Sequence, residues 1–99
     1  MTNEDSNVWK KQDGNIITLG IKKESADAVK EFMFVKLPEV GKNLKKGDVF
    51  VSLEALKWSG HLETPVEGEV VEINEEIYDE PELLNKDPIN NWICKIKIN

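Results

Sequence analysis

The chain has 99 residues, with 13 basic side chains against 19 acidic ones, which gives a formal charge of −6 at pH 7. That length fits one small domain. An acidic protein is repelled by the phosphates of nucleic acids and of anionic membranes, so neither class of partner is expected. One cysteine and one histidine are too few for an internal disulfide or for a cysteine-built zinc site.

Other absences narrow the class of protein further. No stretch approaches the roughly 20 apolar residues that cross a membrane. Residues 1–7 lack the charged and then apolar pattern of a signal peptide, so we expect a cytoplasmic protein. The chain contains neither a glycine-rich phosphate loop nor a nucleophile elbow. We therefore expect neither an autonomous enzyme nor a metal-binding protein.

The predicted elements are mostly short strands. Residues 1–7 are polar and are expected to be disordered. The predicted strands are, in chain order, residues 8–11, 16–21, 32–37, 49–53, 69–73 and 92–98. The first two are joined across Asp13-Gly14, which favours a tight hairpin turn. Ser25 is expected to cap a short helix that carries residues 26–29, and Pro81 to begin a second one that continues to Leu84.

This succession of strands indicates the fold class. Turn signals recur at the spacing of about 8–12 residues that is typical of all-β domains. We predict an all-β fold with short helices, built as a flattened barrel or sandwich of two antiparallel sheets. In the last strand, Trp92, Cys94, Ile96 and Ile98 share one face, so Cys94 is predicted to lie in the core.

Lys57 is the most informative single position. It lies between two stretches that are expected to pair as a hairpin, which places it at an exposed apex. Most lysines are simply solvated surface residues, and that alternative stands beside any functional one. Glu54 precedes this lysine by three residues, and the turn sequence Pro-Val-Glu-Gly at residues 65–68 begins eight residues after it. At this point the sequence resembles the biotinyl and lipoyl carrier domains, whose modified lysine occupies such an apex.

Within those carriers the resemblance narrows to the glycine cleavage H-protein family, and it covers residues 8–97. The segments that carry it are Leu-Gly-Ile at 19–21, Phe-Val-Lys-Leu-Pro-Glu-Val-Gly at 34–41, residues 65–74, and Pro-Glu-Leu-Leu-Asn-Lys-Asp-Pro at 81–88 followed by Trp92. The resemblance implies that residues 8–99 form a lipoyl-carrier domain with the hybrid fold of biotinyl and lipoyl domains. It also implies that lipoate is attached to Lys57. Biotin carriers commonly flank their lysine with methionines, whereas Leu56 and Trp58 stand here, so a biotin carrier is the less favoured alternative.

The same resemblance implies a set of partner enzymes. A lipoate ligase attaches the cofactor. In the family's cycle, the oxidised arm takes an aminomethyl group from glycine decarboxylase and gives it to an aminomethyltransferase. Dihydrolipoyl dehydrogenase then reoxidises the arm. An unmodified interaction domain with the same fold remains a further alternative.

Several positions depart from the family pattern. Asn7-Val8-Trp9 stands where members usually read His-Glu-Trp, and His61 stands where they have an aspartate. The sequence also ends at Asn99, where ordinary members continue into a C-terminal helix. These departures resemble the shortened H-like carriers that are encoded beside a lipoate ligase, a macrodomain protein and a sirtuin that ADP-ribosylates the carrier. If that likeness holds, we favour Asp27 over Glu54 and Glu63 as the acceptor of ADP-ribose, because the family's fold places its helix beside the lysine hairpin. Asp27 is also expected in the first turn of that helix, and the alternative is that it only interacts with the positive end of the helix dipole.

Four more side chains near the apex are candidates for recognition by a partner or by the ligase: Glu54, Trp58, His61 and Glu63. An exposed tryptophan is a favoured anchor at interfaces, although Trp58 has the alternative of packing over the hairpin. His61 has the alternative of an exposed histidine at a strand end with no role. The acidic run from Glu75 to Glu82 is suited to steering basic enzyme surfaces, although such runs are usually just solvated.

Overall fold

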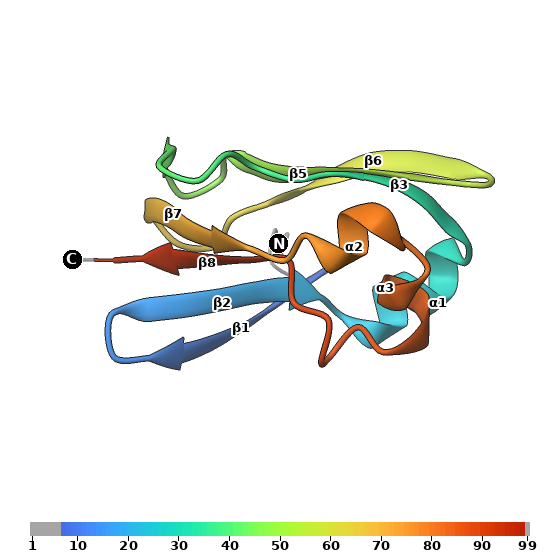
Figure 1. The fold of residues 1–99 in the computed structure, drawn as a ribbon, viewed down its shortest axis with the longest axis horizontal. Coiled ribbons are helices and arrows are strands. Elements are labelled where there is room, and N and C mark those ends of the chain that lie inside the picture. The colour runs from blue at the N-terminus through green and yellow to red at the C-terminus, as the bar shows by residue number, and fades with distance from the viewer. Residues whose placement is uncertain (1–6, 99) are drawn as a thin grey trace, which may run out of the picture.

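The computed structural model describes residues 7–98 and consists of two antiparallel β-sheets that lie face to face, with short helices gathered at one end (Figure 1). The larger sheet has the strand order β1 (Val8–Asp13), β2 (Ile16–Ile21), β8 (Cys94–Lys97), β7 (Gly68–Ile73), β4 (Asn43–Leu44). The smaller sheet has the order β3 (Phe32–Lys36), β5 (Val49–Ala55), β6 (Trp58–Glu63). The sheets stay separate within the described residues. The predicted all-β class is therefore confirmed in its sandwich form and not as a closed barrel.

Apolar side chains from both sheets meet between them and form the core. The larger sheet contributes residues such as Leu19, Val70 and Ile96, and the smaller sheet contributes Val35 and Leu53, all at most 1% exposed. Their neighbours along the strands, apart from Gly20, are more exposed than they are, as expected for sheets with one buried face. The two sheets therefore hold each other through one continuous hydrophobic cluster.

Cys94 lies in this core, as predicted, and its side chain is fully buried. Burial disfavours the charged thiolate and raises the pKa of the Cys94 thiol from its ordinary 9.0 to about 12. At neutral pH the thiol is therefore protonated and inaccessible, which makes it a packing residue and not a nucleophile.

The helices lie at the end of the molecule where β5 turns into β6 (Figure 1). They are α1 (Lys23–Val29), α2 (Glu76–Asp79) and α3 (Leu83–Lys86). Each buries one apolar residue, which is Ala26 in α1, Ile77 in α2 and Leu84 in α3. These helices are too short to be stable alone, so packing of those residues fixes them.

The prediction that Ser25 caps the first helix is wrong. The helix begins at Lys23, its N-cap is Lys22, and no side chain caps it. Ser25 lies inside the helix, where its hydroxyl donates to Asn7 Oδ1 at 2.6 Å. The start of the helix is set instead by burial of Ala26, whose amide donates to the Lys22 carbonyl at 3.0 Å.

Other boundaries differ in smaller ways. The short strand β4 and the helix α2 had no clear signal in the sequence, and α3 begins at Leu83 rather than at Pro81. The last strand begins at Cys94 rather than at Trp92. Trp92 lies before the strand, and Lys95 Nζ is 4.9 Å from the centre of its ring. The expectation of disorder for residues 1–7 falls almost wholly outside the described residues. No described helix has the length and apolar character needed to cross a membrane.

Candidate functional site

Lys57 occupies the tip of the hairpin formed by β5 and β6. Ala55 pairs with Trp58, so only Leu56 and Lys57 form the turn. Lys57 is exposed. The Leu56 amide donates to the carbonyl of Glu31, at 3.0 Å, and so ties the tip to the segment between α1 and β3. The structure therefore presents Lys57 on a short, externally braced turn at one end of a rigid sandwich.

A cavity of about 650 Å³ lies beside this tip. Residues 28–31, at the end of α1, line it on one side, and residues 56–58 line it on the other. Val29, Leu56 and Trp58 make part of this lining apolar. The expectation from resemblance that the first helix lies beside the lysine hairpin is thus confirmed.

The other candidate residues of the hairpin lie along its strands. Glu54 is exposed on β5, opposite Ser59 on one side and Phe34 on the other. His61 lies three residues beyond Trp58 on β6, a strand distance of about 10 Å. His61 Nε2 lies 3.6 Å from Glu63 Oε2, and both side chains are substantially exposed. The structure therefore brings His61 and Glu63 together but places them down the strand from the tip.

Trp58 is the first residue of β6 and is 39% exposed. Its ring lies against Gly60, where a β-carbon would collide with the ring atoms. Packing over the hairpin, the alternative stated for Trp58 from the sequence, therefore applies, although the partner Gly60 carries no side chain that would have signalled the contact. Trp58 therefore has a packing role on its own strand in addition to lining the cavity beside Lys57.

Asp27 lies on α1, but not in its first turn, because the helix begins at Lys23. The argument that Asp27 interacts with the positive end of the helix is therefore wrong. Asp27 Oδ2 accepts a hydrogen bond from Lys23 Nζ at 2.7 Å, and both side chains are more than half exposed. This contact raises the pKa of Lys23 above its ordinary value. Asp27 lines a hollow next to the one that Lys57 lines, and not the same one.

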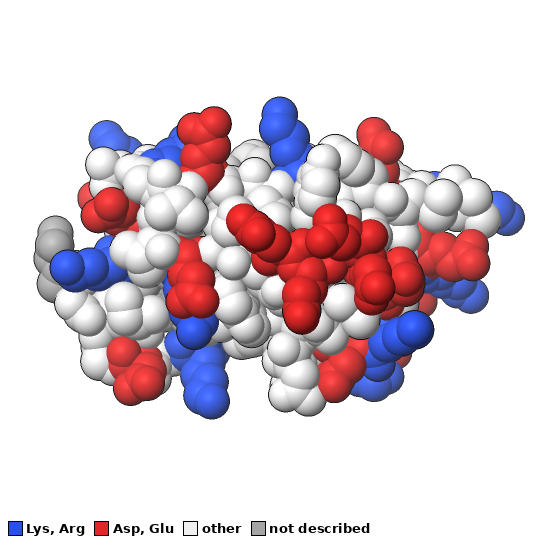
Figure 2. All heavy atoms as spheres, in the orientation of Figure 1, with Lys and Arg blue, Asp and Glu red and all other residues white. Residues whose placement is uncertain are grey.

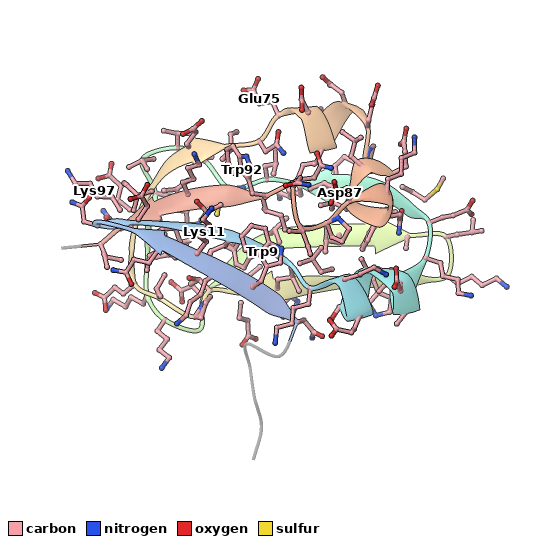
Figure 3. All side chains as sticks on the ribbon, turned by 90° about the horizontal axis from the view of Figure 1, so that it is seen from below. Trp9, Lys11, Glu75, Asp87, Trp92 and Lys97 are labelled. Atoms are coloured by element: carbon pink, nitrogen blue, oxygen red, sulfur yellow. The ribbon has the colours of Figure 1, made fainter. Side chains whose placement is uncertain are left out.

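The acidic run predicted to face solvent forms one area on α2 and on the residues directly before and after it, which we call the acidic surface. Its exposed residues are Glu75, Glu76, Asp79, Glu80 and Glu82. Figure 2 shows these carboxylates gathered on the face that Figure 1 presents, and Figure 3 shows Glu75 projecting away from the domain. Phe34 and Tyr78 form an exposed edge-to-face pair beside it, with ring centres 6.1 Å apart.

Metal chemistry has no support within the described residues. They contain no group of three or more histidine, cysteine, aspartate or glutamate side chains placed to hold a metal ion. The chemically distinctive feature that the structure does offer is a single lysine on a braced tip next to an apolar-lined cavity. A β-sandwich that presents a lysine in this way has the architecture of a biotinyl- or lipoyl-type carrier domain.

Comparison with known proteins defines the family. The family model described as "Glycine cleavage H-protein" matches residues 1–99, and the chain belongs to that family. The chain is 44% identical over 85 residues to a protein of Thermococcus kodakarensis described as a probable glycine cleavage system H protein; the match covers 86% of this chain and 63% of that protein. It is 43% identical over 86 residues to the glycine cleavage system H protein of Clostridioides difficile, and this match covers 87% of this chain and 69% of that protein.

A solved structure gives the same result for the fold. The crystal structure of a glycine cleavage system H protein from Mycobacterium marinum superposes with a TM-score of 0.88 at 26% sequence identity. The superposition covers 99% of this chain and 81% of that one. The chain therefore spans most of that neighbour and, by the match above, 63% of the Thermococcus protein.

Proposed function

We propose that this protein is a lipoyl carrier in which lipoate is joined through an amide to Nζ of Lys57. The observation that carries the proposal is the position of Lys57, exposed on a two-residue turn at one end of a rigid sandwich. An attached arm at that point can reach the active sites of other enzymes while the domain keeps its fold. Membership of the glycine cleavage H-protein family supports the same assignment.

The residues around the tip fit such a group. The Lys57 amine is accessible to an activated carboxyl group, and forming the amide removes the positive charge of the lysine. The cavity of about 650 Å³ beside it offers Val29, Leu56 and Trp58 to an apolar chain. When bound, lipoate supplies a dithiolane that interconverts between disulfide and dithiol and carries groups between enzymes. Cys94 is buried away from solvent, so this protein offers no accessible thiol of its own along the described residues to compete in that exchange.

We further propose the glycine cleavage system as the pathway, because the relatives in Thermococcus kodakarensis and Clostridioides difficile bear that description. The partners are then a lipoate ligase, glycine decarboxylase, an aminomethyltransferase and dihydrolipoyl dehydrogenase. The acidic surface supports partners with basic surfaces, since opposite charges speed the encounter of two proteins. A cytoplasmic location agrees with these partners.

Reversible ADP-ribosylation of Asp27 is a second candidate function, in which a sirtuin adds the group and a macrodomain protein removes it. The exposed carboxylate of Asp27 on α1, directly before the segment that lines the cavity beside Lys57, favours this candidate. Treating the lipoylated protein with a sirtuin and NAD, and mapping the adduct by mass spectrometry, tests it. Modification of another residue, or of none, rejects Asp27.

The attachment of lipoate is tested by incubating the unmodified protein with a lipoate ligase, lipoate and ATP, and measuring the intact mass. We expect one lipoyl group per chain, with the modified peptide containing Lys57. Lys57→Arg abolishes incorporation. Lys46→Arg is the matched control, because Lys46 is also exposed in a turn, at residues 45–48. Incorporation that persists in Lys57→Arg, or a biotinyl mass in protein purified from its native host, refutes the assignment.

Glu54 gives a finer test of recognition by the ligase. Its carboxylate is exposed on the outer face of β5, so Glu54→Ala is expected to slow lipoylation and to leave the melting temperature unchanged. A large fall in melting temperature contradicts a role in recognition and indicates a structural one.

A further inference from the structure

The tip that carries Lys57 lacks the residues that usually stabilise a two-residue hairpin turn. Such turns favour Asn-Gly, Asp-Gly or a leading glycine, because their central residues take positive φ angles. Here the central residues are Leu56 and Lys57, and neither has a positive φ. The conformation of the tip therefore depends on contacts from outside the turn. The hydrogen bond from the Leu56 amide to the Glu31 carbonyl is such a contact.

The segment that provides this carbonyl is itself strained. Lys30, which follows α1, has φ 69° and ψ −139°. It is the one residue other than glycine with a positive φ among residues 7–98. That region of backbone space is favourable for glycine and unfavourable for a residue with a β-carbon, so surrounding contacts must hold Lys30 there.

Asn85 on α3 supplies those contacts. Its Oδ1 accepts a hydrogen bond from the Phe32 amide at 2.9 Å, and its Nδ2 donates to the Lys30 carbonyl. The two bonds flank Glu31, the residue that holds Leu56. Asn85 is in turn fixed by its neighbour Leu84, which is fully buried in the core.

We propose that Asn85 is a positioning residue for the tip that carries Lys57. Asn85 holds residues 30–32 in the strained conformation in which the Glu31 carbonyl binds the Leu56 amide. That bond in turn orders Lys57 for the enzymes that act on it. The role of ordering a modified lysine rests on the lipoyl function proposed above. The role of holding the tip does not, and it can be measured in the unmodified protein.

Hydrogen exchange of the Leu56 amide provides that measurement. Asn85→Ala removes the brace, and we expect exchange of this amide to rise about tenfold, the effect of losing one to two net hydrogen bonds. Asn74→Ala is the matched control. Asn74 also bonds two backbone groups, the Trp92 carbonyl at 2.9 Å and the Glu76 amide at 3.2 Å, and neither group belongs to the tip or to residues 30–32. Its variant is expected to leave the exchange of Leu56 unchanged.

The functional readout is the kinetics of lipoylation by a lipoate ligase. A less ordered tip presents the competent conformation less often, so Asn85→Ala is expected to raise the KM for the carrier about five- to tenfold with kcat unchanged. Adding Lys30→Gly to Asn85→Ala restores part of the loss, because glycine adopts the conformation at position 30 without strain. Asn85→Asp keeps the acceptor for Phe32 and gives an intermediate effect. It replaces Asn85→Ala if that variant does not fold.

The outcomes separate the two proposals. Equal exchange of Leu56 in Asn85→Ala and Asn74→Ala overturns the positioning role, whatever the ligase does. Faster exchange without a change in lipoylation kinetics also overturns it, because the brace then has no consequence for Lys57. Failure of the wild-type protein to be lipoylated at Lys57 rejects the lipoyl function, and the exchange experiment alone then decides whether Asn85 holds the tip.

Discussion

Because the thiol of Cys94 is buried, the stability of this protein is expected to fall at alkaline pH, and the size of the fall can be calculated. Its pKa is 9.0 ordinarily and about 12 in the folded protein, because burial disfavours the thiolate. The unfolded chain therefore releases the proton at a lower pH than the folded one. The contribution of this thiol to stability is complete below pH 9 and is lost as the pH rises towards 12, by about 1.4 kcal/mol per pH unit.

At about pH 10.5 the expected loss is about 2 kcal/mol relative to neutral pH. The assay is urea unfolding of the wild type and of Cys94→Val at both pH values. Valine has a similar volume and no ionisable group, and every other titrating side chain is common to both proteins. The wild type should lose about 2 kcal/mol more than the variant between the two conditions. Equal losses would show that the thiol is not excluded from water in the folded state, and the reasoning would be wrong.

Three further predictions follow from the packing and the charge of the molecule. Cys94 should not react with an aromatic disulfide reagent at pH 7 in the folded protein and should react fully in urea; rapid reaction of the folded form contradicts its burial. Gly68→Ala should lower the free energy of unfolding by about 1–3 kcal/mol, since the added β-carbon meets the backbone of β8. Gly60→Ala should lower it by less, because the added β-carbon meets the ring of Trp58, which can move. A lower urea midpoint for Gly60→Ala than for Gly68→Ala refutes this reasoning. The double variant Glu75→Lys/Asp79→Lys should reduce kcat/KM of lipoylation several-fold at low salt and hardly at about 0.5 M salt. A loss that does not depend on salt shows that the acidic surface does not attract the ligase through its charge.

Local signals predicted much of the fold. The hairpin of β1 and β2 follows from its residues that favour strands and from Asp13-Gly14, and Gly14 indeed has φ 67°. Cys94 was assigned to the core from the alternation in its strand, and it is fully buried. These features depend on residues close together in the sequence, which is why the chain alone revealed them.

The brace behind Lys57 was not predictable in the same way. The bond from Leu56 to Glu31 joins two backbone groups, and any residue pair could make it. Asn85 lies 53 residues from Phe32, whose amide it binds, and its sequence neighbourhood indicated only a short helix. The start of α1 was misplaced for a related reason, since burial of Ala26 outweighs the preference of Ser25 for a cap position. Tertiary contacts decide these details, and propensity does not.

The ring of Trp58 is an intrinsic fluorescent probe of the hairpin tip. It adjoins Lys57 in the sequence, lines the cavity beside the tip, and is 39% exposed. Trp9 on β1 and Trp92, which precedes β8, are half-buried (Figure 3). Trp9 is held there by its indole nitrogen, which donates to the Pro88 carbonyl at 3.1 Å. Neither Trp9 nor Trp92 lines the cavity beside the tip. The proposed modification of Lys57 is therefore expected to change the fluorescence of Trp58, so that reaction can be followed in solution without a label.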